Sequence, residues 1–542
     1  DVSPTLDSAV LDLNVGILRI IASEPMRVTF LNTTQFILTN DNSTSFEITG
    51  SEILQRSEER TTNITLPESL RANLVQYTAT PGGDGVPLTL DVLENGMQDM
   101  GLNPNIAALN LSMVEIGDIT PPVVTGAELK LSEGVLILNM SETIDAEVGG
   151  RLTQFNYPGV PYPINLAKIF ISNSADNNDV GLSLVGAAIG NISSTTLTFN
   201  LTEVQRAALI VISGTSGGDG SPTVLNLQAG AFHDMSINDN EPVSGIPIVE
   251  HPDTVQPFIL AARFNFGTSV LRVESSETLS TVASKQRFDL AFLRNISLKV
   301  NDTNSVNLDG SEILRAELDF FELKIPEVSR VQMMYYSGQS IGDGTPLVLD
   351  VGEGAFKDLA ENNLIAVNGL PVIETSDVIK PALSSAATIN YADGTMRVAM
   401  TETLDRTPIE FTDLDKMFLG NVSNDSAVPL SGASIVAVDT TLFTITLTEL
   451  QRVNAIAMSA TPGGDGSPLI FDMLAKAVVD LSSNLNDDSF NNTLVETRDY
   501  ILPFLESGSI NFSDGRLILK ASETIDLTPK TNVNLPDARF VD

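Results

Sequence analysis

The sequence has no cysteine, no tryptophan and only two histidines, His233 and His251. Without cysteine the chain can form neither disulfides nor thiolate metal sites, and it has no cysteine nucleophile. A zinc site built from several histidines would need more of them than a single domain could offer. Aromatic residues make up only 6% of the chain, which argues against the stacking platforms of sugar-binding sites.

Positive charge is scarce as well. The chain carries 30 lysines and arginines against 69 aspartates and glutamates, a formal net charge of −39. This balance argues against nucleic acid as a partner, because phosphate binding needs a basic face, and it suits a solvated surface or divalent cations. No stretch approaches the ~18 consecutive apolar residues of a membrane-spanning helix. We expect the chain, which starts at Asp1 without a signal peptide, to be a processed protein or a fragment.

Internal repetition is the strongest signal in these 542 residues. Five short motifs recur in the same order: a linker Glu-x-x-Asp followed by proline, (Ser/Thr)-Glu-(Thr/Pro), (Thr/Pro)-Glu-x-x-Arg, Gly-Asp-Gly, and Asp-x-x-x-Asn. The last three motifs occur at Glu68/Arg71, Glu203/Arg206, Glu327/Arg330 and Glu449/Arg452; at Asp84, Asp219, Asp343 and Asp465; and at Asp99/Asn103, Asp234/Asn238, Asp358/Asn362 and Asp480/Asn484.

The spacing between these motifs is fixed in one part of each repeat and variable in another. From the third-motif glutamate to the Gly-Asp-Gly aspartate is always 16 residues, the next step is always 15, and the step to the following linker glutamate is always 16. Between the second and third motifs the distance is 44, 61, 50 and 47 residues. Insertions are tolerated in surface loops rather than in paired strands, so we expect exposed loops in this variable region. The pattern predicts domains at 1–117, 118–252, 253–376 and 377–498, with the first part of a fifth at 499–542.

Local patterns predict an all-β fold. Short apolar or alternating runs, rich in β-branched residues, are separated by clusters of Gly, Asn, Asp and Pro. Residues 128–139 predict a hairpin that turns at 132–134, and residues 388–398 one that turns at 393–394. The third motif predicts a capped single helical turn with an i,i+3 ion pair, followed at once by a strand at 208–213. Several short strands per repeat favour immunoglobulin-like β-sandwiches in an elongated array.

Two of the motifs also carry a family resemblance. The sequences ASEPM (22–26) and SETID, together with the later Asp-x-x-x-Asn, resemble the Ig-like repeats of bacterial surface-layer and large cell-surface proteins. Similar repeats occur in surface and flagellar-hair proteins of heterokont algae. The Gly-Asp-Gly insertion departs from that family's pattern. The resemblance implies an extracellular or cell-surface location and a structural or adhesive role without catalysis.

The acidic residues of the first two motifs are candidate metal ligands. A first hairpin carries the chain away from the linker and back, so the second-motif glutamate should lie beside the linker carboxylates. Clustered carboxylates at a domain junction suit Ca²⁺, which takes six to eight oxygen ligands; the alternative is that each second-motif glutamate ends a strand and is solvated. The candidates are Glu115, Asp118, Glu142, Glu250, Asp253, Glu277, Glu374, Asp377, Glu402, Glu496, Asp499 and Glu523.

The remaining motifs point to turns rather than to chemistry. Gly-Asp-Gly lacks the alternating acids of an EF-hand loop, and it predicts a turn with positive φ at glycine and the aspartate bonded to its own backbone. Asp-x-x-x-Asn is interpreted in the same way. Paired carboxylates occur in every repeat, whereas an enzyme normally has one site, so we expect no catalytic residue.

Asn-x-Ser/Thr sequons are candidate sites of N-linked sugar. Nine of the 13 lie in the variable regions, where we expect exposed loops, and Asn32, Asn63, Asn191, Asn295 and Asn421 are the strongest candidates. The full set is Asn32, Asn42, Asn63, Asn110, Asn139, Asn191, Asn200, Asn295, Asn301, Asn421, Asn424, Asn491 and Asn511.

Residues 499–542 predict two strands, with room for a third, and an apolar row formed by Ile510, Phe512, Leu517 and Leu519. Such a fragment is marginal in water, so either the chain continues or another copy supplies strands by β-augmentation. The second case would produce a head-to-tail filament, with the fragment buried near the first domain of the next copy. The expected function is therefore a structural subunit of an extracellular, glycosylated filament or surface layer. An adhesin stalk or carbohydrate-binding array, and the non-catalytic part of a secreted enzyme, are the alternatives.

Overall fold

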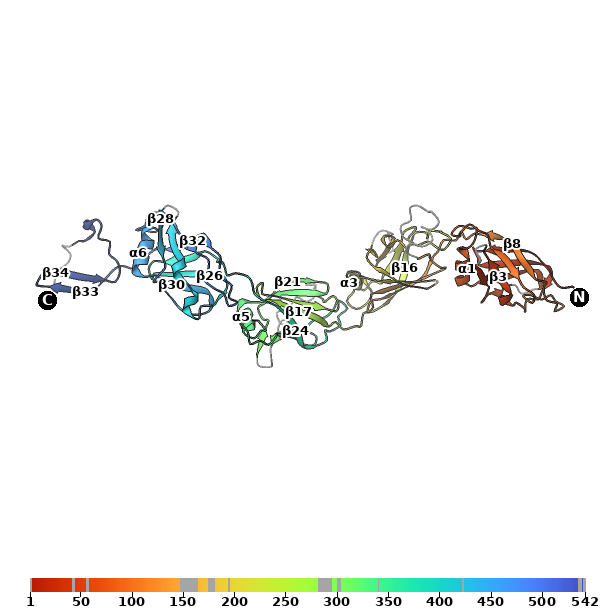
Figure 1. The fold of residues 1–542 in the computed structure, drawn as a ribbon, viewed down its shortest axis with the longest axis horizontal. Coiled ribbons are helices and arrows are strands. Elements are labelled where there is room, and N and C mark those ends of the chain that lie inside the picture. The colour runs from red at the N-terminus through yellow and green to blue at the C-terminus, as the bar shows by residue number, and fades with distance from the viewer. Residues whose placement is uncertain are drawn as a thin grey trace.

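The computed structural model describes residues 2–40, 44–54, 58–146, 164–173, 181–193, 195–280, 295–299, 304–339, 341–421, 424–534 and 539. Four β-sandwiches follow one another in a row, and a lone hairpin follows the fourth (Figure 1). The two chain termini lie at opposite ends of this row. The expected all-β fold of tandem Ig-like domains is confirmed. No helix in the described residues is long and apolar enough to cross a bilayer.

In the described residues each sandwich contains eight strands and one α-helix of 8 to 10 residues. The first contains β1 (Leu6–Asp12), β2 (Ile17–Met26), β3 (Phe36–Thr39), β4 (Ser45–Glu47), β5 (Glu52–Ile53), β6 (Glu59–Thr65), α1 (Glu68–Val75), β7 (Thr89–Val92) and β8 (Ala108–Ile116). The second contains β9 (Val124–Lys130), β10 (Val135–Met140), β11 (Ile169–Ser172), β12 (Leu182–Ser183), β13 (Ala188–Ser193), β14 (Thr196–Asn200), α3 (Glu203–Ile212), β15 (Val224–Leu227) and β16 (Val243–His251).

The third and fourth sandwiches repeat this order. The third contains β17 (Ile259–Asn265), β18 (Val270–Ser275), β19 (Ile296–Lys299), β20 (Ser305–Asn307), β21 (Glu312–Glu317), β22 (Phe320–Lys324), α5 (Glu327–Tyr335), β23 (Val348–Val351) and β24 (Val367–Thr375). The fourth contains β25 (Ala387–Asn390), β26 (Thr395–Leu404), β27 (Met417–Asn421), β28 (Asn424–Pro429), β29 (Ser434–Ile435), β30 (Thr440–Thr446), α6 (Glu449–Ala457), β31 (Leu469–Met473) and β32 (Ser489–Thr497). The hairpin consists of β33 (Leu505–Asn511) and β34 (Arg516–Ala521).

The last strand of each sandwich joins its two halves. In the first repeat the order is β4-β3-β7-β8-β1-β2-β6-β5. The beginning of β8 pairs antiparallel with β7, and its end pairs parallel with β1. Strands β16, β24 and β32 do the same in the other repeats. The parallel pairing delivers the chain to the linker beside the first hairpin of its own repeat.

Period-two burial explains why these segments are strands. In β10 the side chains of Leu136, Leu138 and Met140 are buried and alternate with half-buried ones, which is the pattern of a strand with one face on a core. The tight turn before β10 has Gly134 at φ +63°, and the corresponding turn of the fourth repeat has Gly394 at φ +64°. Both predicted hairpins are confirmed.

The predicted strand at 208–213 is wrong, because 208–212 belong to helix α3. A capping box between Thr202 and Gln205 starts this helix. The helix then buries Leu209 and Ile210 and leaves Val211 exposed. The β-branched run suggested a strand, but here tertiary burial of one helical face overrides the residue preference. The third motif therefore begins a full helix rather than a single turn.

In the described residues, the hydrophobic core of the fourth sandwich consists of residues between Leu383 and Leu494, so residues 377–498 contain all of this core that the structure describes. In contrast, the hairpin of β33 and β34 has no core in the described residues. Its apolar side chains are open to solvent, with Phe512 89% and Leu519 49% exposed.

Candidate functional site

The junction between consecutive repeats is organised around one arginine. In α1, Glu68 and Arg71 lie one turn apart, and the Arg71 Nε and Nη2 groups donate to the two Glu68 oxygens at 2.6 and 3.0 Å. The predicted i,i+3 pair is thus confirmed, and it recurs as Glu203–Arg206, Glu327–Arg330 and Glu449–Arg452. Because the glutamate fixes the guanidinium plane, the remaining N–H groups point out of the helix in a defined direction.

Those remaining groups bind the next repeat. Arg71 Nη1 donates to Asp118 Oδ2 at 2.6 Å, and Nη2 donates to Glu142 Oε2 at 2.9 Å. Nη1 also donates to the Leu13 carbonyl of its own repeat. The equivalent contacts are Arg206 with Asp253 and Glu277, Arg330 with Asp377 and Glu402, and Arg452 with Asp499 and Glu523. The arginine therefore ties the helix of one repeat to the linker and the second motif of the following repeat.

The helix glutamate makes its own contact across the junction. The backbone N–H of Thr143 donates to Glu68 Oε1 at 2.8 Å. Thr278, Thr403 and Thr524 donate in the same way to Glu203, Glu327 and Glu449, each at 2.8 Å. The third residue of the second motif is thus held through its main chain.

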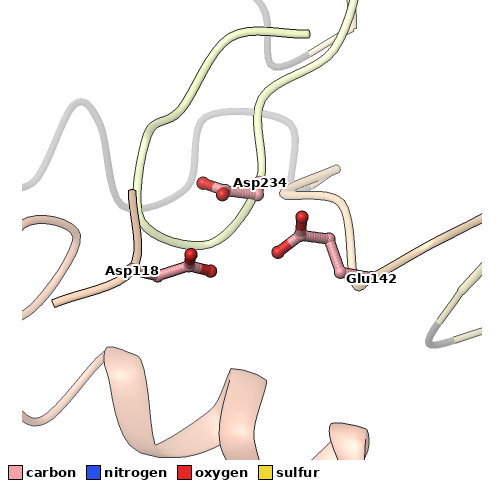
Figure 2. Close-up of side chains that lie close together, drawn as sticks. All are labelled: Asp118, Glu142 and Asp234. Atoms are coloured by element: carbon pink, nitrogen blue, oxygen red, sulfur yellow. The ribbon is translucent and has the colours of Figure 1, made fainter. Parts of the chain in front are cut away.

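A third carboxylate completes each internal junction. An isolated β-bridge joins Ile144 to Asp234, which places the Asp-x-x-x-Asn motif beside the second motif of its own repeat. Asp118, Glu142 and Asp234 then point toward one another, with one oxygen from each within 4.8 Å of the other two (Figure 2). The same triad forms from Asp253, Glu277 and Asp358, and from Asp377, Glu402 and Asp480. All nine residues are buried.

The Asp-x-x-x-Asn loop also inserts an apolar side chain into the preceding repeat. The Asn238 side chain donates to both Asp234 and the Asp118 carbonyl. The next residue after Asp234 is Met235, which is 8% exposed and belongs to the hydrophobic core of the first repeat. Leu359 and Ala360 pack into the second core, and Leu481 into the third. We call this inserted apolar side chain the knob. Each internal junction thus combines a knob with the charged cluster around the arginine.

Backbone packing brings the two repeats close enough for this insertion. A Cβ on Gly82 would lie 2.1 Å from the Met235 carbonyl oxygen, and one on Gly217 would lie 1.9 Å from that of Leu359. Both glycines also have positive φ, +87° and +85°. They belong to the loop that carries Gly-Asp-Gly, so this loop is part of the contact.

Burial changes the ionisation of the second-motif glutamates. Desolvation raises the pKa of Glu142 to about 8, and the nearby Asp118 and Asp234 add to it. Desolvation likewise raises the pKa of Glu277 to about 7 and that of Glu402 to about 9. Burial alone would lower the pKa of Arg71, but its bonds to Glu68, Asp118 and Glu142 outweigh this and raise it. The guanidinium therefore stays charged, and each of these glutamates keeps a proton until the pH approaches its raised pKa.

The linker glutamates lie apart from these clusters, contrary to the expected grouping of Glu115 with Asp118 and Glu142. Glu115 accepts hydrogen bonds from the backbone N–H groups of Ala79 and Leu88, at 2.8 and 2.7 Å. The other three brace the equivalent loops: Glu250 binds Gly214 and Thr223, Glu374 binds Gly338 and Leu347, and Glu496 binds Leu469. Their carboxylates hold the Gly-Asp-Gly loop in place rather than joining the triads.

The Gly-Asp-Gly turns form as predicted. Gly85, Gly220, Gly344 and Gly466 have φ between +86° and +90°. Each aspartate accepts a hydrogen bond from a backbone N–H two residues on, as Asp84 does from Val86 at 2.9 Å. The second oxygen of Asp84, Asp219 and Asp465 accepts from the side chain of Asn40, Asn173 and Asn421.

The sequons fall into different environments. Asn421 is 5% exposed, and its amide donates to the Met458 carbonyl and to Asp465. Exposed sequon asparagines are Asn110, Asn191, Asn200, Asn295, Asn491 and Asn511, and half-buried ones are Asn32, Asn63 and Asn139. Asn42, Asn301 and the side chain of Asn424 lie outside the described part of the chain. Asn110 and Asn491 have positive φ at positions where the other repeats have Gly245 and Gly369, so backbone geometry accounts for their equivalence.

Sequence reasoning missed the central roles of Arg71 and Asp234. Arginine was assigned only a pair within its helix, and Asp234 only a turn. The one sequence signal was the constant spacing of the third and fifth motifs, which shows that both belong to a rigid frame. That they meet across a domain boundary follows only from the parallel pairing of the last strand with the first.

Comparisons with known proteins show no matching family model and no matching curated protein. Among solved structures, domains 1–6 of the surface layer protein SbsC are similar at 11% identity, covering 96% of this chain and 63% of that chain, with a TM-score of 0.18. The FN1–FN3 domains of chicken CNTN1 match at 9% identity over 70% of this chain and all of that one (TM-score 0.19), and the I9–I11 tandem of titin at 8% over 69% and 99% (TM-score 0.14). The chain thus spans less than two thirds of the matched SbsC structure.

Proposed function

We propose that this chain is a structural subunit of an extracellular filament or surface layer, in which Ig-like repeats associate head to tail. The observation that carries the proposal is the junction itself. At each of the three internal junctions, a buried arginine, a carboxylate triad and an apolar knob join the helix end of one repeat to the opposite end of the next. Such a contact is heterologous, so it can repeat without closing and builds a linear array.

The junction suits a mechanical role. Each arginine binds three carboxylates and one carbonyl through bonds of fixed geometry, which limits the angle between repeats. The knob buries apolar surface in the core of the preceding repeat, and a change in the angle between the two repeats would expose that surface to water. The resemblance of the motifs to surface-layer and cell-surface repeats points in the same direction.

Covalent sugar is part of the proposal. The asparagines of the sequons Asn191, Asn200 and Asn295 are exposed and lie in the variable regions. A coat of sugar would cover apolar surface and limit lateral association of long arrays. Asn421 is excluded from this part, because its side chain is buried and a sugar would replace one of the two N–H groups that donate to Met458 and Asp465.

We further propose that the junctions bind a divalent cation. The guanidinium of Arg71 pairs with the carboxylates of Glu68, Asp118 and Glu142. The carboxylate of Asp234 lies close to those of Asp118 and Glu142. Oxygen atoms within 4.8 Å of one another match the span of ligands around one Ca²⁺. Asp118, Glu142 and Asp234 would hold the ion, and its charge would offset their mutual repulsion. The equivalent residues would act at the next two junctions, and Asp499 and Glu523 would contribute two ligands at the fourth.

Electron microscopy of the native material tests the main proposal. Filaments or sheets whose axial repeat is a multiple of one Ig-like domain are expected. Native material that consists only of dispersed single chains, at the concentration found at its source, would contradict it.

A further inference from the structure

At each internal junction the second motif and the Asp-x-x-x-Asn loop of one repeat receive the arginine helix of the preceding repeat, and we call this receiving surface the acceptor. The first repeat also has an acceptor surface, and no described residue covers it. Its Asp-x-x-x-Asn loop has the same conformation as the loops at the internal junctions, with Asn103 bonded twice to Asp99. The fourth residue of the loop has positive φ in every repeat: Leu102 at +69°, Ile237 at +69°, Glu361 at +72° and Ser483 at +69°. The loop is therefore preformed in the same shape whether or not a repeat covers it.

Exposure distinguishes this loop from its counterparts. Met100 occupies the position of Met235 and Leu481, yet it is 57% exposed, whereas they are 8% and 5% exposed. Leu102 beside it is 58% exposed. Two large apolar side chains thus stand at the tip of a rigid loop, at the position that the other repeats use as a knob.

The charged half of the junction is present as well. Glu24 occupies the position of Glu142, in a strand whose last residue, Met26, forms the same isolated bridge to Asp99 that Ile144 forms to Asp234. Ser23 holds the backbone N–H of Thr5 at 3.0 Å, as Ser141 holds that of Val123. An apolar knob and a carboxylate are therefore set side by side, as at the covered junctions.

We propose that this face of the first repeat, formed by Glu24, Asp99, Met100, Leu102 and Asn103, is a docking surface for the helix–loop end of another repeat of this kind. The proposal rests on head-to-tail association and adds the surface that carries it. The occupant is defined by the three covered junctions: a Glu-x-x-Arg helix whose guanidinium meets Glu24, and a Gly-Asp-Gly loop that closes over Met100.

One bond of the internal junctions cannot form here. Where Thr143, Thr278 and Thr403 donate a backbone N–H to the helix glutamate, the first repeat has Pro25, which has no N–H. The surface should therefore bind more weakly than an internal junction. Replacement of Pro25 by threonine should restore the donor and tighten binding.

In the test, the fourth repeat supplies the Glu-x-x-Arg helix and the Gly-Asp-Gly loop. A fragment of residues 377–498 contains every described residue of the fourth core, and without Asp499 and Glu523 its Arg452 can bind another acceptor. The fragment is titrated into the 542-residue chain labelled at the methionine methyl groups, and the Met100 methyl resonance is followed by NMR. Met113, in β8 of the same repeat, serves as the internal control.

A saturable shift of Met100, without a shift of Met113, is expected. Arg452→Lys in the fragment, which keeps the charge but loses the forked geometry, should weaken binding at least tenfold, and Pro25→Thr in the chain should strengthen it severalfold. No shift of Met100 at millimolar fragment, or a shift that Arg452→Lys leaves unchanged, would overturn the proposal. If native filaments are nevertheless seen, the structural function stands and assembly uses another surface.

Discussion

The guanidinium of Arg206 donates to the carboxylate of Glu277 at 2.7 Å, and the two residues belong to different repeats. Both side chains are only 8% exposed. The same arginine binds Glu203 of its own helix and Asp253 of the linker. One side chain thus joins three segments that are remote in the sequence, and its removal gives the sharpest test of the junction.

Arg206→Ala should cost about 3–5 kcal/mol, because it leaves buried carboxylates without their partner. Differential scanning calorimetry of the whole chain should show the second and third repeats unfolding at lower temperature and less cooperatively. Arg263→Ala is the matched control, since Arg263 is 51% exposed and pairs with Glu274 only at 3.6 Å; it should change stability by less than about 0.5 kcal/mol. Equal effects of the two variants would contradict the assigned role.

Two glycines of one loop separate backbone strain from contact between repeats. Gly217 and Gly220 have nearly the same φ, +85° and +88°, so alanine should cost each about 1–2 kcal/mol of local strain. Only at Gly217 would the new Cβ meet another repeat, 1.9 Å from the Leu359 oxygen, while at Gly220 nothing lies within 4 Å. Gly217→Ala alone should therefore open the angle between the second and third repeats, as measured by small-angle X-ray scattering.

Stability should depend on pH through the buried glutamates. Folding raises the pKa of Glu277 from 4.5 to about 7 and that of Glu142 to about 8. Between the unfolded and folded values the folded state binds more protons, so the free energy of unfolding decreases as pH rises. In chelator, raising the pH from 5 to 9 should weaken each junction by on the order of 1 kcal/mol or more. Glu277→Gln should remove the part due to the second junction, and a profile unchanged by it would refute this assignment.

Calcium should raise the stability of the chain, whereas a rise in pH should lower it. An ion that binds only the folded junction raises the melting temperature in millimolar Ca²⁺ relative to chelator. Glu142→Ala should reduce that increase by removing one ligand of the first triad. Glu241→Ala is the control, because Glu241 is an exposed glutamate of the second repeat and belongs to no triad of the described residues. Identical melting curves with and without chelator would remove the cation from the account.

N-linked sugar is expected on exposed sequon asparagines and not on buried ones. Peptide mapping by mass spectrometry of the native protein should find sugar on exposed asparagines such as Asn191 and Asn295. Asn421 should be bare although its sequon is intact, because its amide is bound within the core of the fourth repeat. Modified Asn421, or unmodified Asn191 and Asn295, would contradict this pattern.

The all-β class, two hairpins and the Gly-Asp-Gly turns could be predicted from the sequence, because local chemistry decides them. Turn residues set the hairpins before Val135 and Thr395, and Gly-Asp-Gly forms the turn that its residue types demand. The junction could not be predicted, because its parts are remote in the sequence. Arg71 and Glu142 are 71 residues apart, and the pairing of Ile144 with Asp234 depends on the folded sandwich. Tertiary burial also decided the helix at 208–212, where β-branched residues alone favoured a strand.

Small-angle X-ray scattering of the chain tests the central claim, that arginine-centred junctions join the repeats into one rigid array. The wild-type profile should fit a single elongated conformation. The triple variant Arg71→Ala, Arg206→Ala, Arg330→Ala should keep four folded sandwiches by circular dichroism, yet its profile should require an ensemble with varied angles between repeats. A triple variant whose profile still fits the wild-type conformation would show that these arginines do not set the geometry of the array.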